Sequence, residues 1–427
     1  MTEISTSMAV TKDLSAKQRF NRGAVAVTVA MLPAWSLSFA ESSVGAPLSL
    51  VTTIAVLAVL ATMDRDAIAT VRTDIATVIL YMALAFAGLV AFLLHMSGAG
   101  AILTFSMVAP IGIVLSVATF SIADLRRFVA VPLLATTAIQ AAVVALQSAT
   151  GSAYGYNLLH RGSSLLVTNE TIARPQGMFD HVYEPATVAL IAVAIGLALL
   201  PATGQLRIWF LVGIGFAAST IALTHSRSAL LGLLLVIAIG AFASFRGDTA
   251  LRAGLAVAIV AFLIPALATA SAWQVRFGES ADSDLDDASL GRVTLARQAI
   301  EIAGDHPLFG VGPNNYMRVL ESDYVVDERY PYVVHNESLM IAAELGIPAA
   351  VVFTLIFVWA GMQAIQAGYR PLLLYAAPVP LVVFDVLLYN KPVGLLLFAV
   401  WCGVSGRLGL ARKPALEPAI NGRNSPA

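Results

Sequence analysis

Four side chains in this 427-residue chain have the chemistry to recognise an anion and move a proton: Arg174, Arg227, Arg292 and His335. A guanidinium binds anions through paired, charge-assisted hydrogen bonds. An imidazole takes up a proton near neutral pH. All four lie beside apolar stretches, where a charge is costly unless it meets an anion or a partner. They are therefore the candidate residues for a site.

The two earlier arginines each occupy an unusual local sequence. Arg174 opens the string RPQGMFDHVYEPA, in which Pro175, Gly177 and Pro185 bend the backbone into a shaped loop. An arginine at a membrane boundary also serves as an interfacial anchor, so both interpretations of Arg174 stay open. Arg227 lies in LTHSRSALLG, a turn so short that its guanidinium stands near the helix ends. This position favours an anion-binding role for Arg227.

Arg292 lies in a predicted amphipathic helix, GRVTLARQAIEIAGDHP, that ends at Gly304 and Pro307. We expect its apolar stripe at Val293, Ala296, Ile300 and Ala303. A cation in the first half of a helix opposes the helix macrodipole. Arg292 therefore either meets an anion or forms a salt bridge with the acidic run at 279–289.

This acidic run, ESADSDLDDAS, begins like a calcium-binding loop with Asp282, Asp284 and Asp286. It lacks the glycine at the sixth position, and Val293 stands where the twelfth position needs a glutamate. We therefore expect a solvated loop and no metal site. The lone cysteine, Cys402, also gives no thiolate metal site.

The longest polar segment runs from His306 to Pro348. The glycines and proline of HPLFGVGPNNY, at 306–316, favour a tight turn whose free backbone amides could line an anion or sugar pocket. His335 and Asn336 follow, directly before an apolar run. A histidine at the top of a membrane span is often only interfacial, and the alternative for His335 is a catalytic role.

The elements that must position these residues are membrane helices. The chain is 58% hydrophobic and 12% charged, with a mean hydropathy of +0.82, so we predict an all-α, polytopic transmembrane bundle. Twelve apolar stretches are long enough to cross a bilayer. They lie at 23–40, 44–62, 75–94, 101–120, 128–147, 185–200, 208–223, 229–245, 253–271, 337–360, 371–389 and 392–410.

Lys and Arg in the short loops set the expected orientation, because positive charge stays on the cytoplasmic side. With the N-terminal segment 1–22 in the cytoplasm, the basic loops and the tail at 411–427, expected to be disordered, are also cytoplasmic. The two long loops, at 148–184 and 272–336, then face outward. They separate three groups of spans, at 23–147, 185–271 and 337–410. All six histidines fall on or next to the outer face.

These motifs, in this order and on one side of the membrane, resemble the bacterial O-antigen ligase and polysaccharide polymerase family. The resemblance is carried by RPQGMF at 174–179, THSRSALLG at 224–232, the Arg292 helix, HPLFGVGPNNY at 306–316 and HNESLMIAAELGIPA at 335–349. It covers about residues 165 to 360. It implies an inner-membrane, metal-independent, inverting glycosyltransferase of GT-C type, without a cofactor, that takes glycan from undecaprenyl diphosphate on the periplasmic face.

The resemblance also implies roles for individual residues. Arg174, with one or both of Arg227 and Arg292, matches the essential arginines of the family, and His335 matches its essential loop histidine. Guanidinium groups can stabilise the negative charge that develops on a diphosphate leaving group. His335 suits the base that activates the acceptor hydroxyl, with diphosphate binding as the second possibility. The expected sugar-binding residues are Asn336, Asn314, Tyr316 and Gly312.

The acceptor decides between two activities. A polymerase extends a lipid-linked repeat unit, and it is favoured because the second outer loop has no basic cluster beyond Arg292 and Arg297 to receive a phosphorylated core. The alternative is an O-antigen ligase, whose acceptor is lipid A-core. The implied partners are the undecaprenyl-diphosphate-linked donor, the saccharide acceptor, membrane lipids, and a chain-length regulator or flippase of the same pathway, with no nucleic acid.

A function of another class is a flippase or transporter of lipid-linked oligosaccharide. That function predicts charged residues at mid-membrane depth on several helices. The spans offer almost none apart from Asp385. Asp385 either holds a catalytic arginine or pairs with Lys391.

Overall fold

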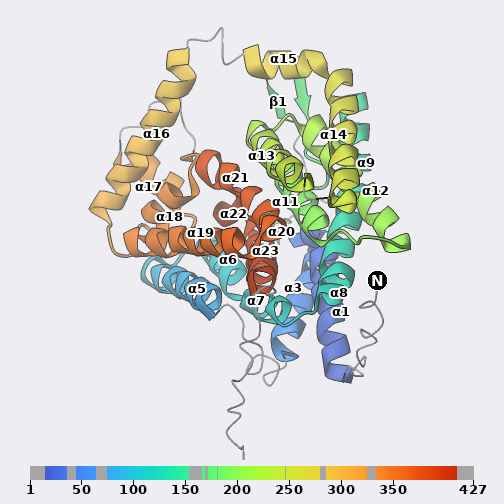
Figure 1. Ribbon diagram of the computed structural model, residues 1–427. Coiled ribbons are helices and arrows are strands. Elements are labelled where there is room, and N and C mark those ends of the chain that lie inside the picture. Colours follow the sequence, from blue (N-terminus) through green and yellow to red (C-terminus); the bar gives the residue numbers. More distant parts are fainter. Residues whose placement is uncertain are drawn as a thin grey trace, which may run out of the picture.

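The computed structural model describes residues 15–35, 45–63, 75–152, 166–168, 172–179, 181–245, 247–278, 285–324 and 333–410. Within these ranges the chain is helical apart from one hairpin of two short strands (Figure 1). In the described residues, eight helical segments are long and apolar enough to span a membrane. This architecture confirms the prediction of a polytopic helical membrane protein.

The elements before the first long loop are α1 (Ala16–Ala30), α2 (Leu32–Trp35), α3 (Gly45–Ala61), α5 (Ile75–His95), α6 (Gly98–Val108), α7 (Ile111–Ala118), α8 (Ile122–Asp124), the π-helix η1 (Leu125–Ala130) and α9 (Val131–Thr150). The central elements are β1 (Leu166–Thr168), β2 (Ile172–Arg174), α11 (Glu184–Leu199), α12 (Gln205–Thr224), α13 (Arg227–Ser244), α14 (Thr249–Ala268), α15 (Ala270–Gly278) and α16 (Leu285–Asp305). The final elements are α17 (Tyr316–Asp323), α18 (Glu337–Leu345), α19 (Ile347–Ala367), α20 (Tyr369–Ala376), α21 (Val379–Phe384), α22 (Leu387–Asn390) and α23 (Pro392–Leu410).

Eleven of the twelve expected spans correspond to helices that are long or apolar enough to compare with them. Eight match the long segments, and three match shorter apolar helices at Leu50–Ala61, Glu184–Leu199 and Tyr369–Phe384. The span expected at 23–40 is described only as far as residue 35. The acidic stretch 279–284 and the tail 411–427 likewise lie outside the described residues.

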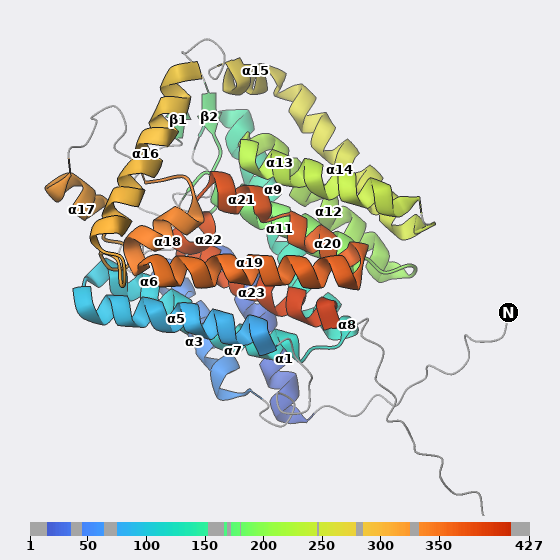
Figure 2. The same cartoon turned by 60° about the vertical axis from the view of Figure 1, so that its left-hand side comes forward.

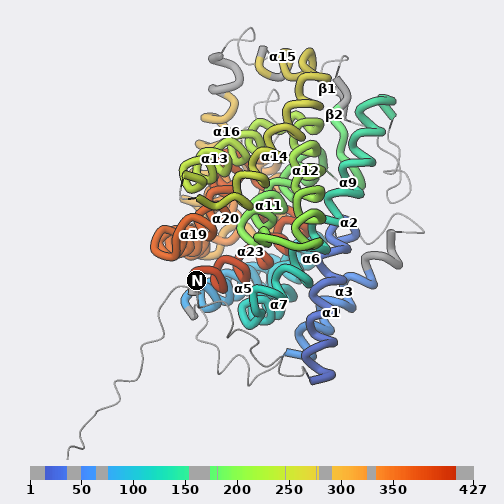
Figure 3. The backbone as a smooth tube through the Cα atoms, turned by 45° about the vertical axis from the view of Figure 1, so that its right-hand side comes forward, coloured from blue at the N-terminus to red at the C-terminus, as the bar shows by residue number. Residues whose placement is uncertain are grey.

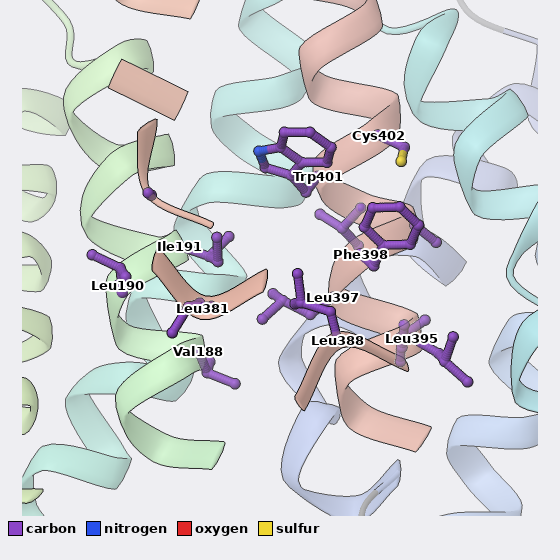
Figure 4. Close-up of a cluster of buried hydrophobic side chains, with 14 of the residues drawn as sticks. Val188, Leu190, Ile191, Leu381, Leu388, Leu395, Leu397, Phe398, Trp401 and Cys402 are labelled. Carbon is purple, nitrogen blue, oxygen red and sulfur yellow. The ribbon is translucent and has the colours of Figure 1, made fainter. Parts of the chain in front are cut away.

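Helix α11 forms the centre of the bundle. Every one of its residues is buried, and α9, α12, α13, α20 and α23 surround it (Figure 3). Its small residues permit this close packing, because a Cβ added at Gly196 would lie 2.8 Å from Ile214. Figure 4 shows side chains of α11, α21, α22 and α23 meeting in the core. An apolar helix shielded from lipid on all sides gives this region a rigid interior.

The described ends of the chain lie at the same end of the bundle. Arg22 of α1 places its guanidinium 5.6 Å from the ring centroid of Phe120, and Arg407 of α23 donates to the Phe120 carbonyl at 2.7 Å. At this end Arg126 and Arg252 also bind carbonyls of the last residues of α11 and α13. Basic side chains therefore complement the negative ends of helix dipoles here.

The last spans are divided where the sequence analysis predicted continuous helices. The span expected at 337–360 begins only at Ile347, because Gly346 has φ +91° and separates α18 from α19. Only glycine adopts this conformation readily. The span expected at 371–389 is broken into α20, α21 and α22, with Asp385 in extended backbone. Both breaks fall beside candidate site residues.

The two long loops contain more structure than expected. In the first, β1 pairs antiparallel with β2 in the register Leu166 to Arg174, so Arg174 ends a strand. In the second, α16 runs along one edge of the molecule from α15 to α18 (Figure 2). It begins at Leu285 rather than at Gly291, so part of the acidic run is helical.

Candidate active site

One cavity of about 420 Å³ lies between the hairpin loop, α13, α16, the start of α18 and the break after α21. All four residues that the sequence analysis proposed as catalytic line this cavity. Among the described residues, the lining is Arg174, Tyr183, Arg227, Ser228, Leu231, Arg292, His335, Phe384 and Asp385. Segments more than 200 residues apart in sequence thus contribute to one polar cavity with an apolar edge.

Arg174 is buried, with 4% of its surface exposed. Its Nη1 donates to the Tyr183 hydroxyl at 3.2 Å, and its Cζ lies 4.5 Å from the Tyr183 ring centroid. Within the described residues, its Nε and Nη2 have no hydrogen-bond partner. Burying these donors unsatisfied is costly. Two donors of a fixed cation are therefore available to an anion in the cavity.

Two glutamines of α9 hold the loop that follows Arg174. The Gln147 side chain bonds to both backbone polar groups of Gly177. It donates to the Gly177 carbonyl at 2.8 Å and accepts from the Gly177 amide at 2.9 Å. Gln140 accepts from the Met178 amide at 2.8 Å. Gly177 has φ +64°, and an added Cβ would lie 2.4 Å from the Gln140 oxygen. The loop is therefore shaped by the helix beneath it.

Arg227 is the first residue of α13. His225 ends α12 in the left-handed conformation with φ 52°, and Ser226 begins α13 by accepting from the Ala229 amide at 3.3 Å. This tight connection, predicted from THSRS, places Arg227 and Ser228 at the cavity.

Asp385 is the cavity residue that the sequence analysis left undecided. It is buried, and its carboxylate accepts from the Val386 amide at 3.0 Å and the Ser228 hydroxyl at 3.2 Å. Burial raises the pKa of Asp385 to about 6, although these hydrogen bonds and the charges of Arg174 and Arg292 oppose the rise. This placement favours the interpretation in which Asp385 accompanies the arginines. Its sequence signal is a single acid in the apolar run LVVFDVLL.

Arg292 lies on α16, and His335 lies directly before α18, which packs against α16. Arg292 is seven positions after Leu285, the start of α16, so the expected conflict with the dipole at the helix N-terminus was wrong, because the effect is confined to the first turn. His335 precedes Asn336, the N-cap of α18. Burial, and then the charge of Arg292, lowers the pKa of His335 below its ordinary value. The imidazole is therefore neutral near pH 7 and available to accept a proton.

The predicted apolar stripe of α16 was partly wrong. Val293 and Ile300 are 54% and 58% exposed. The helix instead buries Leu295, Ala299 and Ile302, with Ala303 beside them. These positions follow the spacing i, i+4, i+7 of a helix face. The buried face is adjacent to the predicted face and shares Ala303 with it. The correct face still leaves Arg292 at the cavity.

Most amides of the turn at 306–316 are bonded within the protein, which corrects the prediction of free amides for these positions. Val311 and Gly312 donate their amides to the carbonyls of Ala343 and Glu344 at 2.9 and 2.8 Å. The Glu344 carboxylate accepts from the amides of Asn314 and Tyr316 at 2.8 and 3.2 Å. The segment therefore packs against the C-terminal end of α18.

The four predicted sugar-binding residues, Asn336, Asn314, Tyr316 and Gly312, are not among the residues that line the cavity. Asn336 caps α18 by accepting from the Leu339 amide at 3.0 Å, and it donates to the Val383 carbonyl at 3.3 Å. Tyr316 is almost fully buried. Gly312 has φ +91° and lies against His95. Among the described residues, these four therefore lie outside the cavity lining.

Residues 210–354, about a third of the chain, match the family model of the O-antigen ligases. This segment is therefore similar to the O-antigen ligase domain. Members of the family are membrane glycosyltransferases that act as ligases or polymerases. The match contains Arg227, Arg292 and His335, while Arg174 and Asp385 lie outside it. A comparison with curated proteins found no match.

Proposed function

We propose that the protein transfers glycan from an undecaprenyl diphosphate carrier to a saccharide acceptor at the periplasmic face of the bacterial inner membrane. The observation that carries this proposal is the convergence of Arg174, Arg227, Arg292 and His335 on one cavity. Three guanidiniums beside one carboxylate leave a surplus of positive charge, which suits a diphosphate. The neutral imidazole among them suits a base.

In this mechanism the arginines bind the donor diphosphate and stabilise the charge that grows on it as the glycosidic bond breaks. His335 accepts the proton of the acceptor hydroxyl as that oxygen attacks the anomeric carbon from the opposite side, so the configuration inverts. The guanidiniums supply the positive charge that a divalent metal supplies in other glycosyltransferases. The exposed apolar side chains of Leu231 and Phe384 at the cavity suit the lipid part of the donor.

The arrangement of charges supports a periplasmic cavity. Arg227 begins α13 at the cavity, and this 18-residue helix ends four positions before Asp248, which pairs with Arg370 at 3.1 Å. A helix of this length rises about 27 Å, close to the thickness of a bilayer core. Arg126, Arg252 and Arg370 lie at the far end, and short basic loops are typically cytoplasmic. The cavity then faces the periplasm.

The placement of the charges also favours an enzyme over a transporter. Arg174 ends β2, Arg227 begins α13, His335 precedes α18 and Asp385 follows α21. These four residues stand at the ends of elements and Arg292 lies on α16 in the second long loop, whereas a transport path needs polar groups at mid-membrane depth. The site is therefore built at one surface of the bundle.

The acceptor distinguishes polymerase, which we propose first, from ligase, which the name of the matching family model favours. Deleting the gene and separating the cell's lipid-linked and surface glycans on a gel tests both. Single repeat units on capped core indicate a lost polymerase, and full-length chains left on carrier lipid indicate a lost ligase. Glycans identical to the wild type would contradict the proposed function.

A further inference from the structure

Glu337 is a fully buried carboxylate that the mechanism above does not use. It is the first residue of α18, two positions after His335, and none of its surface is exposed. Its Oε1 accepts from the Leu388 amide, and its Oε2 accepts from the Tyr389 amide at 3.1 Å. Both amides belong to α22, on the other side of the break that contains Asp385.

The two bonds replace a missing helix cap. The N-cap position of α22 is Val386, whose side chain cannot accept a hydrogen bond. The first amides of a helix have no partner within the helix, and a polar N-cap side chain normally accepts from the second or third. Leu388 and Tyr389 hold these two positions, and Glu337 accepts from both. A residue of α18 thus caps α22.

A third bond joins the start of α18 to the end of α21, on the other side of the break. The Asn336 side chain donates to the Val383 carbonyl at 3.3 Å while accepting from its own helix at Leu339. His335 and Asp385 both line the cavity. His335 lies just before α18 and Asp385 just before α22, and the first turns of these two helices are hydrogen-bonded to each other. We propose that Glu337, assisted by Asn336, is a positioning residue that fixes His335 relative to Asp385. This inference rests on the proposed function only for its kinetic consequences.

The chain provides a matched control in Glu344. It is a second fully buried glutamate of α18, and it accepts from the amides of Asn314 and Tyr316 and from the Tyr389 hydroxyl at 2.8 Å. The peptide segment that it holds does not line the cavity. Replacing Glu344 with Gln leaves both bonds from α22 to Glu337 in place, and the amide oxygen of Gln can still accept from the Tyr389 hydroxyl.

The test uses full-length protein in detergent, carrying E337Q, N336S or E344Q. Gln at 337 presents a donor to an amide, whereas Ser at 336 keeps the cap and loses the bond to Val383. The first readout is the rate at which diethyl pyrocarbonate modifies His335, followed by mass spectrometry with His306 as reference. We expect a rate at least about threefold higher in E337Q, a smaller rise in N336S and none in E344Q, because a loosened imidazole is more accessible.

The second readout is glycan transfer per folded molecule. In E337Q we expect kcat to fall by about tenfold or more, with the KM for the lipid-linked donor within about twofold because the arginines bind the diphosphate. The acid limb of the pH profile should move to higher pH, since a less buried His335 regains its ordinary pKa. E344Q should leave the acid limb in place.

Unchanged His335 labelling in both E337Q and N336S would overturn the positioning role, even if transfer were never observed. If E337Q does not fold, N336S alone decides through the same labelling. Wild-type protein without transfer activity would instead contradict the proposed function. The two failures are thus distinguishable.

Discussion

Replacing Arg174 with Met should abolish transfer without destabilising the protein. Arg174 leaves Nε and Nη2 unbonded in a buried position, so we expect both to donate to the donor diphosphate. Hydrogen bonds to charged groups contribute about 1.5–3 kcal/mol each. Two such bonds, made most strongly in the transition state, correspond to a loss of roughly 10²- to 10⁴-fold in kcat/KM. Arg174→Lys keeps the charge without the paired geometry and should lose about tenfold.

The stability of the same variant separates function from folding. A buried cation without full hydrogen bonding is costly to the folded state. Met fills similar volume without that cost, so the unfolding midpoint of Arg174→Met should equal or exceed that of the wild type. Activity is measured by transfer from lipid-linked oligosaccharide, and stability by thermal unfolding in the same detergent.

The control for this prediction is Arg207→Ala. Arg207 is a partly buried arginine that donates to the Ala202 carbonyl at 2.9 Å, and it does not line the cavity. This variant should keep wild-type activity. An Arg174→Met protein that retains more than half of the wild-type kcat/KM would refute the assignment of Arg174 to the diphosphate.

Three further predictions concern the metal, the proton and the scaffold. Transfer should continue in EDTA because guanidiniums supply the positive charge, and a requirement for added Mg²⁺ or Mn²⁺ in the chelated assay would count against this site. Activity should persist below pH 6.5, because the lowered pKa of His335 keeps the imidazole neutral there, and should fall as the pH drops through that lowered value. A kcat/KM profile whose acid limb lies above pH 6.5 would be inconsistent with His335 as the base. Gly346→Ala should lower the unfolding midpoint strongly, because φ is +91° and an added Cβ would lie 2.3 Å from the Leu308 carbonyl oxygen. A thermal unfolding curve like that of the wild type would show that this turn is not needed.

The chemistry of individual side chains, together with the family resemblance, predicted candidate residues that line the cavity. The local sequence pattern was less successful for the neighbouring turn at 306–316 and for the buried face of α16. Arg227 was identified because permanent charge beside apolar sequence is costly, and this reasoning does not depend on knowing the fold. Arg174 was identified from the glycine and prolines of its loop, Arg292 from a conflict with the helix dipole that the longer helix removes, and His335 mainly from the family resemblance. Their approach to one cavity depends on long-range packing around α11. Asp385 was noticed for the same reason as Arg227, but its neighbours come from α13, α16 and the hairpin loop.

The errors arose where tertiary contacts override local pattern. The glycines of 306–316 predicted exposed amides, but the carbonyls and carboxylate of α18 accept them. The stripe of α16 was assigned to Val293 and Ile300 because they are larger than Ala299, which packs inside. The cap that Glu337 provides to α22 joins residues 51 and 52 positions apart, and no local motif encodes it.

The most direct test of the central account is transfer by the purified full-length protein in liposomes. The donor is undecaprenyl-diphosphate-linked oligosaccharide, offered with unlabelled lipid-linked repeat unit or with lipid A-core as acceptor. The account predicts that one acceptor becomes elongated while undecaprenyl diphosphate is released in equal amount, and that His335→Ala protein of normal stability does neither. Intact donor with both acceptors, or wild-type rates in His335→Ala, would contradict it.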